Sequence, residues 1–216
     1  MSQRYQDIIE RWEDAGSSDE ASLAIHPTGG RPLDYERSGF EAALEVMSIL
    51  NPHTHPDGTV LDFGCGDGRV LRHLGGRYDH TAGYDTSESM RSRAHHTCRR
   101  ALILDELNGS HERFDLVFSY AVFIHHTHTD GVQMLNSIAK LLVRGTGLAA
   151  VQIPVYDEAR APQSWIDVGV WTPPMLHEAA DACGLEVVTL HRNLGAFSFD
   201  NIGVHHGRLQ VFRRNS

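Results

Sequence analysis

Short runs of apolar residues alternate with stretches of helical spacing along most of the chain. The runs are four to six residues long, which is typical of strands. The expected strands are residues 59–63, 81–84, 101–104, 116–119, 148–153, 185–190 and 208–212. The stretches between them predict helices at residues 69–74, 87–98, 129–143 and 173–183. This alternation predicts an α/β domain with a largely parallel sheet and helices on both faces.

Local signals mark several helix ends. Thr172, followed by Pro173, predicts a helix start, and Gly184 predicts the end of the same helix. Near the N-terminus, helical spacing predicts a first helix that ends near Gly16, and a loop over residues 17–35 follows it. A capping box then predicts the start of a second helix. The residues behind these predictions are Tyr5, Ile8, Ile9 and Trp12 in the first helix, Ser38 and Glu41 in the capping box, Phe40, Ala43, Leu44, Met47 and Leu50 on the inner face of the second helix, and Asn51 and Pro52 at its end.

Composition and charge are close to those of an ordinary soluble domain. Of the 216 residues, 41% are hydrophobic and 22% are charged, and this length suits one domain. No apolar run approaches the roughly 18 residues that span a bilayer, and the polar start lacks the apolar stretch of a signal peptide. We therefore expect a cytoplasmic protein that does not contact a membrane. The net charge of −9 argues against a nucleic-acid surface, and the one dense basic cluster is expected to be a solvated helix face, made of Arg91, Arg93, Arg99 and Arg100.

A glycine-rich turn follows the first strand of the expected sheet. Gly64, Gly66 and Gly68 alternate there, which allows a tight turn and close approach of a ligand to the backbone. Asp85 follows the next strand, about 20 residues after the turn, where a carboxylate can accept both hydroxyls of a ribose. Strand, turn, helix and spaced acid in this order predict a site for a ligand that contains a nucleoside.

Two residues of this region differ from what a dinucleotide-binding turn requires. A dinucleotide turn reads G-x-G-x-x-G, which would place the third glycine at position 69, but that residue is Arg69. Asp62 stands two places before the first glycine, and its negative charge suits a sulfonium ligand with an amino group better than a pyrophosphate. An NAD-dependent oxidoreductase is therefore a disfavoured alternative.

The motifs together resemble those of the class I S-adenosylmethionine-dependent methyltransferases. Residues 60–68 resemble motif I of that family, Asp85 matches its ribose-binding acid, and Asp105 stands at the acidic position beside the adenine ring. Residues 114–119 resemble the family's fourth strand. Residues 141–147 resemble its L-x-P-G-G turn, with arginine in place of the proline. The resemblance covers about residues 38–212 and implies a Rossmann-like sheet of order 3-2-1-4-5-7-6 with an antiparallel last strand.

The resemblance also implies a cofactor, S-adenosyl-L-methionine, and a division of the chain. We expect one methyltransferase domain over residues 1–216, with an N-terminal helical lid segment (1–52), a cofactor-binding core (59–154) and a C-terminal substrate-side half (155–216). Tyr35, in the lid segment, is a further candidate contact to the cofactor. The expected cofactor-binding residues are Asp62, Phe63, Gly64, Gly66, Gly68, Asp85, Thr86, Asp105, Glu106 and Ser119.

The absence of several known motifs reduces the number of possible methyl acceptors. The chain reads Ser-Tyr-Ala-Val over residues 119–122, where DNA amino-methyltransferases carry [DN]-P-P-[YF] and cytosine-C5 enzymes a Pro-Cys, and no glutamate pair indicates arginine methylation. We therefore expect O-methylation of a small polar molecule such as a sugar or natural product. The alternatives are an RNA or protein methyltransferase and a non-catalytic protein that binds the cofactor.

His125 follows the expected fourth strand and is the first candidate for a catalytic base, because an imidazole can take a hydroxyl proton near neutral pH. A residue that only packs beside the cofactor is the other interpretation of His125. The alternative bases are His126, His128, His205 and His206. No metal site is expected, because His125, His126 and His128 lack a carboxylate at ligand spacing and the three cysteines are widely spaced.

Two long segments, 155–171 and 193–206, interrupt the regular pattern. Loops of this length in a compact domain are often functional, so both are candidates to shape the acceptor pocket. Their aromatic residues either contact substrate or cover the sheet edge, and the sequence favours neither. These residues are Tyr156, Trp165, Trp171, Phe197 and Phe199.

Overall fold

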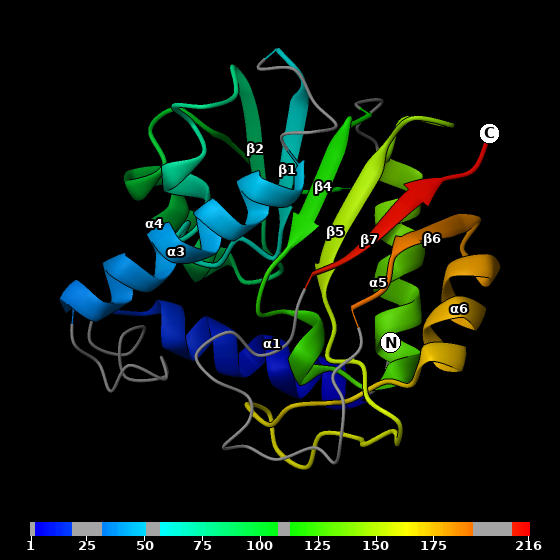
Figure 1. Cartoon of the computed structure of the whole chain (residues 1–216). Helices are drawn as coiled ribbons and strands as arrows, with labels where there is room; N and C mark the ends of the chain where they lie inside the picture. Colours follow the sequence, from blue (N-terminus) through cyan, green and yellow to red (C-terminus); the bar gives the residue numbers. More distant parts are fainter. Residues whose placement is uncertain (1–2, 19–31, 51–56, 108–112, 192–208) are drawn as a thin grey trace. The chain divides into compact units, whose positions relative to one another are not determined.

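The computed structural model describes residues 3–18, 32–50, 57–107, 113–191 and 209–216 (Figure 1). Its contacts group into two compact units. Residues Met1–Tyr5 and Arg113–Ser216 form the first, and Gln6–Glu112 form the second. The boundary between the units falls within the first helix, after Tyr5. Each unit is described by itself.

The second unit contains three parallel strands with their helices. Strand β1 pairs with β2, and β2 pairs with β3, all in parallel. Residues 60–63 of β1 are buried in succession, as expected of a strand covered on both faces, and this explains why three of the four are apolar and only Asp62 is charged. The elements are α1 (Gln3–Gly16), α3 (Pro32–Leu50), β1 (Thr59–Phe63), η2 (Leu71–His73), β2 (His80–Tyr84), α4 (Glu88–Thr97) and β3 (Leu102–Leu104).

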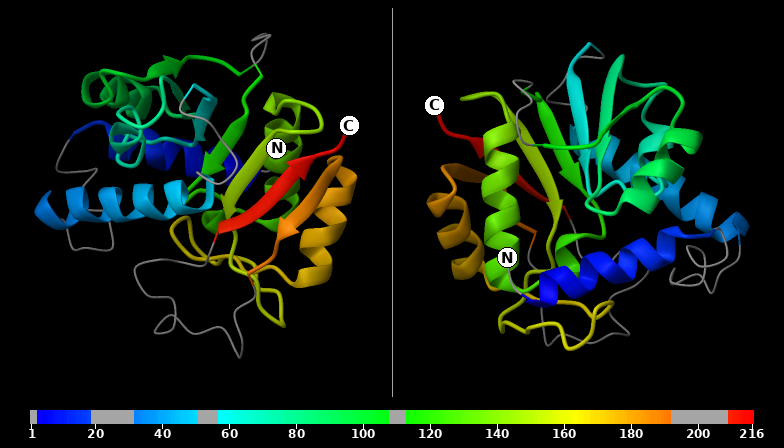
Figure 2. Two further views of the ribbon diagram at one scale, coloured as in Figure 1. Left: turned by 45° about the horizontal axis from the view of Figure 1, so that its top comes forward. Right: turned by 180° about the vertical axis from the view of Figure 1, so that it is seen from behind.

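The first unit contains the remaining four strands. Strand β4 pairs with β5 in parallel, and β7 pairs antiparallel with both β5 and β6. Helix α6 packs against α5 and against β6 (Figure 2). The elements are β4 (Leu116–Ser119), η3 (Phe123–His125), α5 (His128–Leu141), β5 (Leu148–Gln152), α6 (Pro173–Ala182), β6 (Leu185–Thr189) and β7 (Leu209–Arg214).

The strand order is β3-β2-β1-β4-β5-β7-β6. Together with the antiparallel β7, it confirms the Rossmann-like sheet predicted from the sequence. Several boundaries are confirmed to the residue, among them β1 and β4. The predicted cap of α6 is also present, because the Thr172 side chain accepts from the amide of Met175 and Gly184 has a φ of 68°.

The predicted start of the second helix was wrong. Helix α3 begins at Pro32, and Ser38 lies in its interior, where its Oγ donates to the carbonyl of Tyr35 at 2.7 Å. Proline suits the first position of a helix because its missing amide is not needed there, and Asp34 in the first turn favours the helix dipole. The Ser38–Glu41 pair that resembles a capping box therefore lies inside a helix, and residues 32–35 are helical.

The predicted inner face of α3 is confirmed at Ala43, which is fully buried, but it was wrong for two of its large residues. Phe40 and Leu44 are 49% and 47% exposed. A β-carbon on Gly39 would lie 2.4 Å from the carbonyl oxygen of Arg69, so the helix packs too closely for a larger side chain. Small residues, rather than the largest apolar ones, mark the packed face. The buried residues of this face are Tyr35, Ser38, Gly39, Ala42, Ala43 and Val46.

The helix expected over residues 69–74 is reduced to the short 3₁₀ turn η2. Gly68 just before it has a φ of 85°, so the chain leaves the glycine-rich turn in a left-handed conformation. Leu71 and Leu74 are nevertheless fully buried, which explains the helical spacing that the sequence shows.

Candidate functional site

The glycine turn, residues 64–68, is packed against the end of β2. The amides of Gly64 and Cys65 both donate to the carbonyl of Tyr84, at 2.7 and 3.0 Å. All three glycines have positive φ, and a β-carbon on Gly68 would lie 2.1 Å from Sγ of Cys98. A β-carbon on Gly66, by contrast, would meet nothing within 4 Å. The turn is therefore rigid underneath and open at Gly66, where a ligand can approach the backbone.

Asp85 is joined to this turn, as the sequence predicted. Its Oδ2 accepts from the amide of Gly66 at 2.9 Å, and its Oδ1 accepts from the amide of Ser87 at 2.9 Å. Burial raises the pKa of Asp85, although these hydrogen bonds act to lower it. Since each carboxylate oxygen has two lone pairs, each keeps one for a ligand hydroxyl.

Asp62 adds a second carboxylate to the same region. It is 2% exposed, and its pKa lies well above the ordinary value because of burial and then the negative charge of Asp85, with Arg69 acting in the opposite direction. Two carboxylates that oppose each other's ionisation favour a positively charged ligand between or beside them. A cationic ligand near Asp62 would therefore stabilise its charged form.

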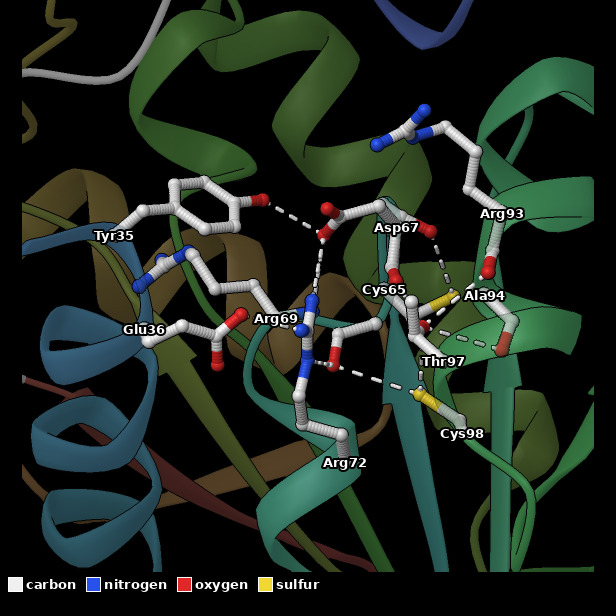
Figure 3. Close-up of polar contacts among 12 residues, drawn as sticks. Tyr35, Glu36, Cys65, Asp67, Arg69, Arg72, Arg93, Ala94, Thr97 and Cys98 are labelled. Atoms are coloured by element: carbon white, nitrogen blue, oxygen red, sulfur yellow. Dashed lines mark hydrogen bonds and ion pairs between the residues drawn. The ribbon is translucent and has the colours of Figure 1, made fainter. Parts of the chain in front are cut away.

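A network of hydrogen bonds holds the glycine turn from behind (Figure 3). The hydroxyl of Tyr35 donates to Oδ1 of Asp67 at 2.7 Å, and the amide of Arg69 donates to the same oxygen at 3.1 Å. Oγ1 of Thr97 donates to the carbonyl of Asp67 at 2.5 Å. Tyr35, which the sequence suggested as a cofactor contact, thus bonds to the turn itself and fixes Asp67.

Three of the expected cofactor-binding residues are exposed: Thr86 after β2, and Asp105 and Glu106 of the segment expected near adenine after β3. Arg91 of α4 contacts the loops that carry these residues. Its Nη1 donates to the carbonyls of Asp85 and Thr86 at 2.8 and 3.2 Å, and its Nε lies 3.8 Å from Asp105. The Arg91 side chain is only 15% exposed, so the prediction of a solvated basic face was wrong for this residue. The spacing of arginines along α4 gave no hint of these contacts, because they are made to the backbone of the loop before α4 and to a side chain after β3.

In the first unit, Ser119 ends β4 and is fully buried. Two residues later, Ala121 has a φ of 61°, a conformation that is unfavourable for any residue with a β-carbon. Its amide donates to Oε1 of Gln152 at 2.7 Å, and Gln152 is 1% exposed. Backbone strain of this kind is often held at functional sites. The sequence gave no signal for the role of Gln152, which holds the strained turn.

We expect Ala121→Gly to raise the free energy of unfolding by about 1 kcal/mol, because glycine adopts positive φ without the cost that a β-carbon carries. Ala139→Gly, at a buried position in the last turn of α5, is the control and should lower it by about 1 kcal/mol. Urea unfolding of both variants measures the difference. Loss of stability in Ala121→Gly would show that the turn is not strained.

His125 ends the short turn η3, and its ring is oriented by the backbone. Its Nδ1 lies 3.3 Å from the carbonyl oxygen of Asp167. A carbonyl only accepts, so this contact places the proton on Nδ1 and makes Nε2 the basic nitrogen. The next residue, His126, is buried, and burial lowers its pKa to about 4. The ring of His128 packs edge-on against Trp171 with centroids 4.5 Å apart.

The segment 155–171 is built around Asp167. Arg160 binds both of its carboxylate oxygens, at 3.0 and 2.7 Å, and the amides of Gln163 and Val168 donate to it at 2.6 and 2.8 Å. Although burial acts to raise it, these bonds hold the pKa of Asp167 below its ordinary value. The segment that orients His125 is thus fixed by an ion pair between a buried aspartate and a partly exposed arginine. Sequence analysis did not identify this pair.

The aromatic residues of the segment 155–171 differ in their exposure to solvent. Tyr156 and Trp171 are 5% and 2% exposed and belong to the interior, whereas Trp165 is partly exposed. The other segment, residues 193–206, lies outside the described residues, together with Phe197, Phe199, His205 and His206. Within the described part of the chain, no group of three or more His, Cys, Asp or Glu side chains could hold a metal. No helix there is long and apolar enough to span a membrane.

Residues 60–145 match the sequence model of a family described as a methyltransferase domain. No curated protein sequence matches the chain significantly. Among solved structures, magnesium protoporphyrin IX methyltransferase from Synechocystis PCC 6803, with bound S-adenosylmethionine, is 17% identical, with a TM-score of 0.62 over 82% of this chain and 80% of that one.

Two further structures share the fold. An amino pentose methyltransferase from Micromonospora echinaspora, also with bound S-adenosylmethionine, is 17% identical, with a TM-score of 0.60 over 82% of this chain and 92% of that one. An S-adenosylmethionine-dependent methyltransferase from Leishmania major is 16% identical, with a TM-score of 0.66 over 97% of this chain and 81% of that one. Residues 60–145 thus match the methyltransferase-domain family that the motifs resemble, and the chain shares the fold of solved S-adenosylmethionine-dependent methyltransferases, as the sequence predicted.

Proposed function

We propose that the protein uses S-adenosylmethionine to methylate a hydroxyl group of a small polar molecule. The observation that carries the cofactor assignment is the pair of amide contacts that orients Asp85, from Gly66 of the glycine turn to one oxygen and from Ser87 at the start of α4 to the other. In this proposal the Asp85 carboxylate, held next to the open position at Gly66, accepts hydrogen bonds from both ribose hydroxyls. Asp62 supplies the negative charge for the cofactor's amino group.

The remaining predicted contacts complete the cofactor site in this proposal. Phe63 and Gly64 border the methionine part, Thr86 and the exposed pair Asp105 and Glu106 border the adenosine, and Ser119 ends β4. The bound cofactor supplies a methyl group already activated by a positive sulfur. The protein therefore has to hold donor and acceptor in line, and alignment of this kind accounts for much of the rate of such reactions.

His125 is proposed as the general base. The acceptor oxygen forms a bond to the methyl carbon while the bond from that carbon to sulfur breaks, and the hydroxyl proton passes to Nε2 of His125. The contact from Nδ1 to the Asp167 carbonyl supports this role, because it sets the tautomer in which Nε2 can accept a proton. His126 is a weaker candidate, because it is buried against the ring of Tyr5 at a centroid distance of 5.2 Å.

Two observations favour a small molecule as the acceptor. The net charge of −9 disfavours RNA, and two of the similar structures belong to enzymes described as acting on magnesium protoporphyrin IX and on an amino pentose. The test is transfer of a labelled methyl group from S-adenosylmethionine to a panel of hydroxylated small molecules, total RNA and protein extract. Label on a small molecule at oxygen supports the proposal. Label only on RNA or protein, or binding without any transfer, would replace it with one of the alternatives.

The buried carboxylate of Asp62 predicts that cofactor binding releases a proton. Burial and the nearby Asp85 raise its pKa in the ligand-free protein, and a cationic ligand would lower it again. Titrations in two buffers of different ionisation enthalpy should therefore give different apparent binding enthalpies, and the difference should grow as the pH is lowered from neutrality. Asp62→Asn should remove most of the difference. Equal enthalpies in both buffers would contradict the assignment.

The same shift has a consequence for stability. A carboxyl whose folded-state pKa is raised contributes stability that is fully present below its ordinary pKa of 3.8 and is lost as the pH rises through the raised folded-state pKa. At neutral pH, Asp62→Asn should therefore raise the Tm of the ligand-free protein while weakening cofactor binding. Function and stability are expected to oppose each other at this residue.

A further inference from the structure

The end of helix α1 makes a dense set of contacts with the start of helix α4. Oγ of Ser87 donates to Oε2 of Glu13 at 2.7 Å, and the amide of Ser89 donates to both carboxylate oxygens of Glu13, at 3.0 and 3.2 Å. In the same direction, Oγ of Ser89 donates to the backbone carbonyl of Glu13 at 2.7 Å. A carboxylate from one helix thus satisfies amide and hydroxyl donors at the N-terminus of another, where negative charge is favoured.

The fit at this junction leaves no spare room. A β-carbon on Gly16 would lie 2.1 Å from Oγ of Ser89 and 2.9 Å from the amide nitrogen of Met90. Although burial acts to raise it, the hydrogen bonds from Ser87 and Ser89 hold the pKa of Glu13 below its ordinary value. Glu13 is therefore held as a charged, hydrogen-bonded group between two helices.

Ser87 connects this junction to the cofactor carboxylate. Its side chain caps α4, since its Oγ accepts from the amide of Met90 at 3.1 Å, and the same Oγ donates to Glu13. Its backbone amide donates to Oδ1 of Asp85. Glu13 fixes Ser87, and Ser87 fixes one oxygen of Asp85, while the glycine turn fixes the other.

We propose that Glu13 is a positioning residue for cofactor binding. By docking α1 onto the first turn of α4, Glu13 holds the Ser87 amide in the place from which it orients Asp85 toward the ribose. Docking of α1 and binding of the cofactor are then coupled, so each strengthens the other by the same factor. This inference rests on the proposed ribose contact of Asp85.

The test compares Glu13→Ala with Glu10→Ala by calorimetric titration with S-adenosylhomocysteine. Glu10 lies one helical turn earlier on α1 and is exposed. The Glu10→Ala variant therefore removes the same charge at a solvent-facing position of the same helix. We expect Kd to rise about tenfold in Glu13→Ala and to change less than twofold in Glu10→Ala. Gly16→Ala should also raise Kd about tenfold, because the added methyl group would push α1 away from Ser89. Alanine has a higher helix propensity than glycine, so a loss of affinity would not come from a weaker α1 helix.

A double-mutant cycle separates positioning from general destabilisation. If Glu13 acts through Asp85, Glu13→Ala will change Kd less than twofold in the Asp85→Ala background, whereas independent effects would add. Ligand-induced protection of the α4 amides from hydrogen exchange should also disappear in Glu13→Ala. Additive effects in the cycle, or wild-type affinity in both Glu13→Ala and Gly16→Ala, would overturn the inference.

The two proposals fail in different ways. If Asp85→Ala weakens binding and Glu13→Ala does not, the ribose contact stands and only the positioning role of Glu13 is wrong. If Asp85→Ala binds like the wild type, the proposed ribose contact itself is wrong.

Discussion

Replacing Asp85 with alanine is expected to weaken S-adenosylmethionine binding about 100-fold. The carboxylate is proposed to accept both ribose hydroxyls, and hydrogen bonds to charged groups contribute about 1.5–3 kcal/mol each. The change also leaves the amides of Gly66 and Ser87 without their acceptor, so the glycine turn loses its link to the loop after β2. Calorimetric titration at neutral pH gives the change in Kd directly.

Asp57→Ala is the matched control for this experiment. It removes one negative charge from the same unit at an exposed position, and its Kd should stay within twofold of the wild type. A thermal melt of each variant checks that the fold is retained. If Asp85→Ala bound with an affinity within threefold of the wild type, the cofactor would have to be held in another way.

Replacing His125 with alanine is expected to lower kcat about 10²- to 10⁴-fold, the range that general base catalysis contributes, with little change in the Kd of the cofactor. The acidic limb of the pH–rate profile, where a histidine base is protonated, should also disappear. The measurement is steady-state methyl transfer to the acceptor found in the screen.

Two further variants distinguish a base from a residue that packs. His125→Asn has an amide that can still donate to the Asp167 carbonyl, so it should keep the segment 155–171 in place and yet lose kcat as alanine does. His177→Ala changes an exposed histidine of α6 and should leave kcat unaltered. If both His125 variants kept kcat within threefold, His125 would only pack beside the cofactor.

The fold was largely predictable because its strands are buried and its turns carry glycine. Strands β1 and β4 were predicted to the residue, since nearly every side chain in them is buried and the apolar run ends where burial ends. Helix α3 was misplaced because its packed face consists of small residues, so the large apolar residues Phe40 and Leu44 suggested the wrong side. Sequence spacing shows where apolar side chains recur along a helix. It does not show where two segments pack so closely that only a residue with a small side chain fits.

The candidate site was predictable only where its residues form a local motif. The glycine turn and Asp85 follow adjacent strands, so order and spacing were enough to bring them together. The bond between Glu13 and Ser87 spans 74 positions, and the bond from Tyr35 to Asp67 spans 32. No spacing rule relates residues so far apart. The ion pair between Arg160 and Asp167 joins residues that are closer in sequence. It lies in an irregular segment, however, where no repeating pattern predicts contacts.

The most direct test of the account is calorimetric titration of the wild-type protein with S-adenosylmethionine and, separately, with NAD. A turn with Arg69 in place of the third glycine and with a buried carboxylate at Asp62 predicts micromolar binding of S-adenosylmethionine and no measurable binding of NAD. Preference for NAD, or no binding of S-adenosylmethionine, would contradict the central claim.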